Sequence, residues 1–405
     1  MVRQQILALI ALASAAPVLA QQAPPVPTSG PDIVVTGISL KDAQAGLARC
    51  LEQHCPPDRD IAATLAVAET QFVAGDYKAA RAVMAKSIGR NQRFAKTYPV
   101  PVSDLLRANS RVAVHLGEAE SYRSGALDVV SALKAGLPET DPRVLDARVE
   151  LGDAFLKTGQ SDSALDMYKK VARQAHDLHL GHVEGYALLR VASAYSAISR
   201  TRNDGYYVSA IKACDTVVAL TDPAAAPFVG AAKLLKAKLG VKNGDPDAID
   251  RLIDIYRALA VGATSPVLLY APEIKQPDLS GMESGSGETL GKMAMGDFDG
   301  QWVDIGFEVG ADGKVSTAEV LRQSPKLSGE WIKPVLTAIN GRRYAPLGAG
   351  IQSAPRVERY TYTATWTTYV GSRMRVRSPI PKIEILDLSR DEPAAKAPPS
   401  DAEPR

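Results

Sequence analysis

The spacing of hydrophobic residues divides the chain into two parts with different periods. From about residue 60 to residue 260, apolar residues recur every three to four positions, which is the period of an amphipathic helix. From residue 301 the period shortens to two, and Val303, Ile305 and Phe307 alternate with Asp304 and other non-core residues. The pattern therefore predicts an α+β protein whose helices precede its strands.

The C-terminal part predicts a small domain over residues 301–377. Residues 301–325 read as a hairpin that turns at "ADG". Residues 329–346 read as a helix followed by a short strand, and residues 356–371 read as a long strand. We expect one face of that long strand to carry Tyr360, Tyr362, Ala364 and Trp366. The predicted order is β-β-α-β with this further long strand.

The helical part contains internal repeats. The segment "ARVELGDAFLKTGQSDSALDMYKKVA" (147–172) resembles a tetratricopeptide repeat (TPR), with looser copies over 61–88 and 185–220. Small residues stand where two antiparallel helices approach, and large residues fill the gaps between repeats. The signature positions are Leu151, Gly152, Phe155, Gly159, Ala164 and Tyr168.

The TPR resemblance implies an α-solenoid over residues 40–261. Stacked helix pairs bury a continuous core and leave a concave face, which in such proteins usually binds a peptide or a protein. The alternative is a plain solenoid whose groove is filled by its own chain, since stacking alone accounts for the repeats.

The C-terminal part resembles the TonB C-terminal domain. The matching stretches are "FEVGADGKV", "VLRQSP", the helix that carries Ala338, and "RRYAP", all within about 301–370. In its family this domain belongs to periplasmic energy transducers and binds extended segments of outer-membrane receptors. The resemblance implies a peptide that adds a strand to a free sheet edge. The residues expected at the docking edge are Val303, Ile305, Phe307, Tyr360, Tyr362 and Trp366.

The N-terminus predicts export. Residues 1–20 have a basic start, an apolar run and a small-residue ending, which together indicate a signal peptide cleaved after Ala20. We therefore expect a periplasmic protein. An uncleaved helix would instead anchor the chain in the membrane and favour the alternative function of a TonB-type energy transducer.

Within the extended segment 21–39, the sequence "PDIVVTG" (31–37) resembles a TonB box. Three placements are open for it: against the first repeats, on this protein's own sheet in cis or between copies, or on a separate partner. Two other stretches lack periodicity and are expected to be a linker (262–300) and a disordered tail (378–405).

Composition narrows the classes of function. Charged residues make up 23% of the chain and the net charge is +2, so nothing points to nucleic acid. Aromatic residues make up 6%, which argues against a receptor barrel with aromatic girdles. Cys50 and Cys55 are either two thiols or a disulfide, which the oxidising exported compartment would favour.

Catalytic patterns are weak. The Gly-rich stretch 284–293 lacks the residues of a phosphate-binding loop. His176, His179 and His182 could hold a metal, but solvent-facing histidines at a repeat junction are the simpler interpretation. We therefore expect no catalytic residue and no cofactor. The prediction is a non-enzymatic scaffold for protein partners in the cell envelope, whose only membrane contact is through a partner or an uncleaved N-terminus. A hydrolase or metal enzyme remains the rival from another class.

Overall fold

A computed structural model describes most of the chain. The described ranges are 38–200, 205–240, 247–258, 266–274, 300–316, 318–327, 331–347, 353–368 and 375–389. The predicted signal peptide, the segment "PDIVVTG", the stretch 284–293 and residues 390–405 lie outside them. None of the helices in these ranges has the length and apolar character needed to cross a membrane.

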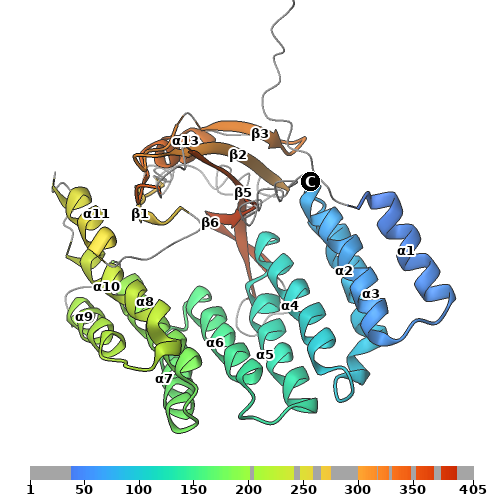
Figure 1. Ribbon diagram of the computed structural model, residues 1–405. Helices are drawn as coiled ribbons and strands as arrows, with labels where there is room; N and C mark the ends of the chain where they lie inside the picture. Colours follow the sequence, from blue (N-terminus) through green and yellow to red (C-terminus); the bar gives the residue numbers. More distant parts are fainter. Residues whose placement is uncertain are drawn as a thin grey trace, which may run out of the picture. The chain divides into compact units, whose positions relative to one another are not determined.

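The helical part is a stack of antiparallel helix pairs, as predicted (Figure 1). Each helix packs on the next in sequence. The helices are α1 (Leu40–Glu52), α2 (Pro57–Val73), α3 (Tyr77–Asn91), α4 (Pro99–His115), α5 (Ala119–Gly136), α6 (Pro142–Lys157), α7 (Ser161–Asp177), α8 (Gly181–Ser199), α9 (Gly205–Val218), α10 (Ala226–Leu239) and α11 (Ala248–Ala258). Short 3₁₀ turns, Gln92–Phe94 and Pro223–Ala225, precede α4 and α10.

The turns inside three successive pairs have the same geometry. Gly75, Gly117 and Gly159 follow α2, α4 and α6, with φ of 81°, 73° and 82°. This left-handed backbone is accessible to glycine without a steric penalty. The first of these turns is completed by Asp76, whose carboxylate accepts a hydrogen bond from the Ala79 N–H at 2.9 Å and caps α3. The repeat is thus defined by its turns as well as by its core.

The second part is a four-stranded antiparallel sheet with strand order β3-β2-β5-β6. Its strands are β2 (Gln301–Gly310), β3 (Glu319–Gln323), β5 (Ser353–Thr368) and β6 (Arg375–Asp387). The helix α13 (Ile332–Asn340) covers one face, where it buries Val335 and Ile339 against Val303, Ile305 and Tyr360. Two short strands, β1 (Leu268–Tyr270) and β4 (Arg343–Tyr344), pair separately. The predicted β-β-α-β order with a further long strand is present.

Two predicted boundaries are wrong. Residues 378–387 belong to β6 and are not a disordered tail. The predicted linker 262–300 contains β1, which pairs with β4. Pro379 and Pro381 make the sequence of β6 look like a tail. However, the Leu388 N–H donates to the Val357 carbonyl at 2.8 Å, so even-numbered positions of β6 bond to β5. Pro381, opposite Ala364, therefore stands at a position that faces the open edge, where a missing N–H costs no ladder bond, and Pro379 lies where the register is irregular.

The close helix packing at Gly152 gives a stability prediction. A Cβ added at Gly152 would lie 2.4 Å from Cε1 of Tyr168, whose side chain is fully buried. We expect Gly152→Ala to lower the free energy of unfolding by about 1–3 kcal/mol, because the tyrosine ring cannot move away. Urea denaturation measures this change.

The matched control is Gly46→Ala in α1, where nothing lies within 4 Å of the added Cβ. This change should raise stability by roughly 0.5–1 kcal/mol, because alanine favours a helix. Equal effects at the two positions would contradict the packing argument.

Candidate functional site

The sheet face opposite α13 contacts the turns of the helical repeats through a buried ion pair. Arg359 Nε and Nη2 donate to the two carboxylate oxygens of Asp304 at 2.6 and 2.9 Å. The remaining N–H groups of Arg359 donate to the carbonyls of Phe72 and Val73 at 2.7 and 2.8 Å. These carbonyls belong to the last turn of α2, where the Phe72 carbonyl also accepts the Gly75 N–H at 2.9 Å. Arg359, from the second part, thus caps a helix of the first.

Trp302 joins the two parts next to this pair. Its indole belongs to the hydrophobic core of the first repeats, together with Tyr77 and Met84. The Arg359 guanidinium lies 4.1 Å from the centre of the indole, a cation–π contact. The indole also covers Gly75, where an added Cβ would be 2.1 Å from Nε1. Only glycine leaves room for the indole at this turn.

A third contact centres on the hydroxyl of Thr361. It lies 3.0 Å from the Tyr77 hydroxyl and 3.0 Å from Nδ1 of His115. The rings of Phe72, Tyr77 and His115 have centroids 5.0–5.2 Å apart and exclude water from the contact. Burial lowers the pKa of His115 to about 4, helped by the charges of Lys157 and Arg359. The ring is therefore neutral at physiological pH.

Two further contacts follow the same row of turns. The backbone N–H of Trp366 donates to the backbone carbonyl of Gly117 at 2.8 Å. Lys157, at the end of α6, donates to Glu384 of β6 at 2.5 Å. The turn regions of three successive repeats therefore contact β2, β5 and β6. The repeats and the sheet are joined by polar, aromatic and ionic contacts.

The structure corrects the predicted docking edge. Strands β2 and β5 carry the six predicted residues, but both are central strands with neighbours on each side. The ladder occupies the backbone groups of the first five residues, and the backbone N–H of Trp366, past the start of β2, donates to the Gly117 carbonyl. Val303, Ile305, Phe307 and Tyr360 are buried, and Tyr362 stacks on Trp331 at a centroid distance of 5.1 Å. The edges among the described residues are β3 and β6.

Trp366 is corrected in a second way. The register of β5 with β6 is irregular between Ala364 and Trp366. Trp366 lines a hollow with Lys78 of α3 and Leu116 of the α4–α5 turn, on the side of the repeats. A strict two-residue alternation predicted the opposite face.

The other predicted residues lie in different places. The signature residues Leu151, Gly152, Ala164 and Tyr168 are buried between helices, Phe155 is half-buried, and Gly159 forms the α6–α7 turn. Cys50 and Cys55 are joined by a disulfide with a Cα–Cα distance of 5.1 Å. These residues hold the fold and do not form a shared site.

The three histidines do not converge. His176 Nδ1 lies 3.0 Å from a carboxylate oxygen of Glu184, and His182 packs edge-on against Phe228. His179 has a φ of 55° just after the end of α7. Within the described ranges, no group of three or more His, Cys, Asp or Glu residues could hold a metal ion.

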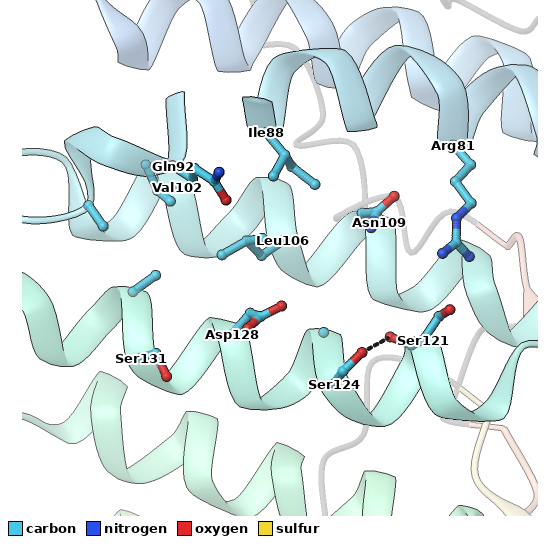
Figure 2. A pocket seen from close by; sticks show the side chains of 13 residues that line it. Arg81, Ile88, Gln92, Val102, Leu106, Asn109, Ser121, Ser124, Asp128 and Ser131 are labelled. Carbon is cyan, nitrogen blue, oxygen red and sulfur yellow. Dashed lines mark hydrogen bonds between the residues drawn. The ribbon is translucent and has the colours of Figure 1, made fainter. Parts of the chain in front are cut away.

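A cavity of about 440 Å³ opens between α3, α4 and α5 (Figure 2). The α5 side of this cavity is small and polar, with Ser121, Ser124 and Asp128. Burial raises the pKa of Asp128 above its ordinary value. The α4 side contributes Leu106 and Asn109. The residues that line the cavity do not place a nucleophile beside a general base. Its short serine side chains are of the kind found where two helices pack closely.

Comparison with solved structures finds proteins that match parts of this chain. BtubC (BKLC) from P. vanneervenii has a TM-score of 0.42 and 13% identity, over 59% of this chain and 98% of that chain. A putative kinesin light chain with nearly identical TPR-like repeats, from Podosopora anserina, has a TM-score of 0.38 and 17% identity, over 51% of this chain and 96% of that chain. A variant form of that kinesin light chain has a TM-score of 0.39 and 18% identity, over 50% of this chain and 95% of that chain. No family model matches the sequence. No curated protein matches it either.

The buried ion pair gives a prediction for stability. Arg359→Met removes both helix-capping hydrogen bonds and leaves Asp304 buried without this partner. We expect the free energy of unfolding to fall by about 1–3 kcal/mol, because buried hydrogen bonds to a charged group are lost while Arg322 still pairs with Asp304 at 2.6 Å. Chemical denaturation followed by tryptophan fluorescence measures the change.

The matched control is Arg257→Met in α11. The ion pair of Arg257 with Asp254 leaves the two side chains 64% and 75% exposed, so its loss should cost less than about 1 kcal/mol. A loss at Arg359 no larger than at Arg257 would show that the interface does not stabilise the protein.

The environment of His115 gives a pH prediction. Its folded pKa of about 4 lies below the ordinary 6.5, so its neutral form stabilises the fold fully above pH 6.5. As the pH falls from 6.5 to 4, the unfolded chain takes up a proton that the folded chain does not. The free energy of unfolding should therefore fall by roughly 3 kcal/mol more in the parent than in His115→Asn. Parallel stability curves for the two proteins over this range would refute the assignment.

Proposed function

We propose that this protein is an exported, non-enzymatic scaffold that binds an extended peptide segment of a partner at the free edge of its sheet. Two features support the proposal: a stack of helix pairs of the TPR-like kind, which commonly serves protein interaction, and an antiparallel sheet with open edges. The resemblance to the TonB C-terminal domain and the signal-like N-terminus suggest a periplasmic setting with a link to outer-membrane transport.

The observation that carries the proposal is the outer edge of β6. Because even-numbered positions of β6 bond to β5, the backbone groups of Ile383, Ile385 and Asp387 point outward. Pro381 removes one donor from this edge, and the register is irregular beyond it. The side chain of Ile385 is 48% exposed, which is unusual for isoleucine. This short stretch combines free hydrogen-bonding groups with apolar surface, the two requirements for adding a strand.

The other edge, β3, is the second place where a strand could add. All five of its residues are exposed, including Val320 and Leu321. Its pairing with β2 is irregular between Asp304 and Ile305, and such an irregularity twists an edge away from flat pairing. We therefore favour β6.

A peptide titration tests the proposal. The probe is a labelled synthetic peptide with the sequence of residues 31–37, which resembles a TonB box, added to a protein shortened to begin at residue 38. We expect saturable binding that Ile385→Pro weakens at least about tenfold, because proline removes an outward N–H and no ladder bond. Fluorescence anisotropy gives the affinity.

Ile385→Val is the matched control, since it keeps the N–H and a branched apolar side chain, and it should bind like the parent. Absence of binding to the parent would refute peptide capture by this sheet. Loss of binding in Val320→Pro, with Ile385→Pro unaffected, would assign the docking edge to β3.

A further inference from the structure

A second hollow of about 440 Å³ lies where α3 and the α4–α5 turn face the β5–β6 end of the sheet. We call it the Trp366 slot. Its polar and aromatic lining consists of Lys78, Arg81, Glu118, Trp366 and Arg375. The rest of its wall is short and apolar, from Ala82, Ala85 and Leu116. The slot is built by both parts of the chain.

At the slot, β5 extends past the start of β2. Strand β2 begins opposite Tyr362, and beyond that point the backbone N–H of Trp366 donates to the Gly117 carbonyl at 2.8 Å. The register of β5 with β6 is irregular next to Trp366, and such irregularities are often found next to functional sites. Trp366 is half-buried, and a tryptophan is a frequent anchor of protein interfaces.

The charges in the slot are unbalanced. Glu118 forms an ion pair with Arg81, which accounts for one cation. Lys78 and Arg375 have no acidic partner among the residues that the structure describes. The Arg375 guanidinium lies 5.6 Å from the centre of the Trp366 ring, and Arg377 lies 5.0 Å from it. The slot therefore carries an excess of positive charge around the Trp366 ring, because its one acidic group, Glu118, is already paired with Arg81.

We propose that the Trp366 slot binds an acidic peptide segment of a partner protein. Lys78 and Arg375 would pair with carboxylates of the segment, and Trp366, Leu116 and the alanines would contact the apolar residues between them. The excess positive charge of the slot is complementary to such a segment. This inference extends the proposed scaffold function by adding a second contact, away from the β6 edge, for the same class of partner.

Nucleic acid fits the slot less well. A phosphate backbone would need an extended basic track, whereas the chain's net charge is only +2. The chain's own N-terminal segment 21–39 holds a single acidic residue, Asp32, and is a poor electrostatic match.

The test uses the full chain and two acetylated, amidated peptides. One alternates glutamate and leucine, and the other has glutamine in place of glutamate. We expect saturable binding of the glutamate peptide by isothermal titration calorimetry, weakening as salt is added, and at least about tenfold weaker binding of the glutamine peptide. The double variant Lys78→Glu/Arg375→Glu should also bind the glutamate peptide at least about tenfold more weakly.

Lys86→Glu is the matched control, because Lys86 is exposed on α3 and does not line the slot. It should bind the glutamate peptide within about twofold of the parent. All variants should unfold at the parent's temperature, since the changed residues are exposed. Equal binding of both peptides, or equal weakening by Lys86→Glu and the double variant, would overturn the proposal.

Two other occupants are distinguishable. Deletion of residues 390–405 that strengthens peptide binding tenfold or more would show that the chain's own tail fills the slot, which would overturn the partner proposal. Displacement of the glutamate peptide by single-stranded oligothymidylate would point to nucleic acid instead. The slot and the edge are tested separately, because Ile385→Pro should leave binding of the glutamate peptide unchanged. The double variant should leave binding of the 31–37 peptide unchanged.

Discussion

The buried Arg359–Asp304 pair is the interaction on which the arrangement of the two parts depends. Two ionised groups removed from water are stabilised only if their hydrogen-bonding capacity is satisfied. Here the carboxylate takes two N–H groups of Arg359 and pairs with Arg322, and the carbonyls at the end of α2 take the other N–H groups of Arg359. Displacing the sheet would remove the two hydrogen bonds that Arg359 donates to the end of α2. The geometry of the contact is therefore strongly specified.

The turns of the repeats have a second role because of this contact. In a plain solenoid, the glycine turn only reverses the chain. In this protein, Gly75 has no side chain and so leaves room for the indole of Trp302. The carbonyl of Gly117, in the next turn, accepts the backbone N–H of Trp366. One local feature, repeated from pair to pair, thus builds a regular surface for the sheet. The chain's own sheet thus covers the turns of three pairs.

The sequence was sufficient to predict the elements and insufficient to predict how they meet. Periodicity located the helix pairs, α13 and the long strand, because each element buries one face. The interface escaped prediction because Trp302, Asp304 and Arg359 occupy the alternate positions that normally face solvent. Only the knowledge that Gly75 contacts a tryptophan far along the chain could have indicated the interface. The spacing of residues in the sequence does not contain this knowledge. Alternation also cannot distinguish a central strand from an edge strand, which explains the error over β2 and β5.

The contact between repeats and sheet bears directly on how a partner could be bound. A module on a flexible linker would present its sheet edge in many orientations, and binding would have to offset the loss of that freedom. Here the β6 edge and the Trp366 slot both belong to the sheet that Arg359 and Trp302 hold on the repeats. The distance between the two surfaces is then fixed by the fold. A partner that carries both a strand-forming and an acidic segment would bind the second surface as an intramolecular step, at high effective concentration. The buried ion pair would thus contribute to affinity without touching the partner.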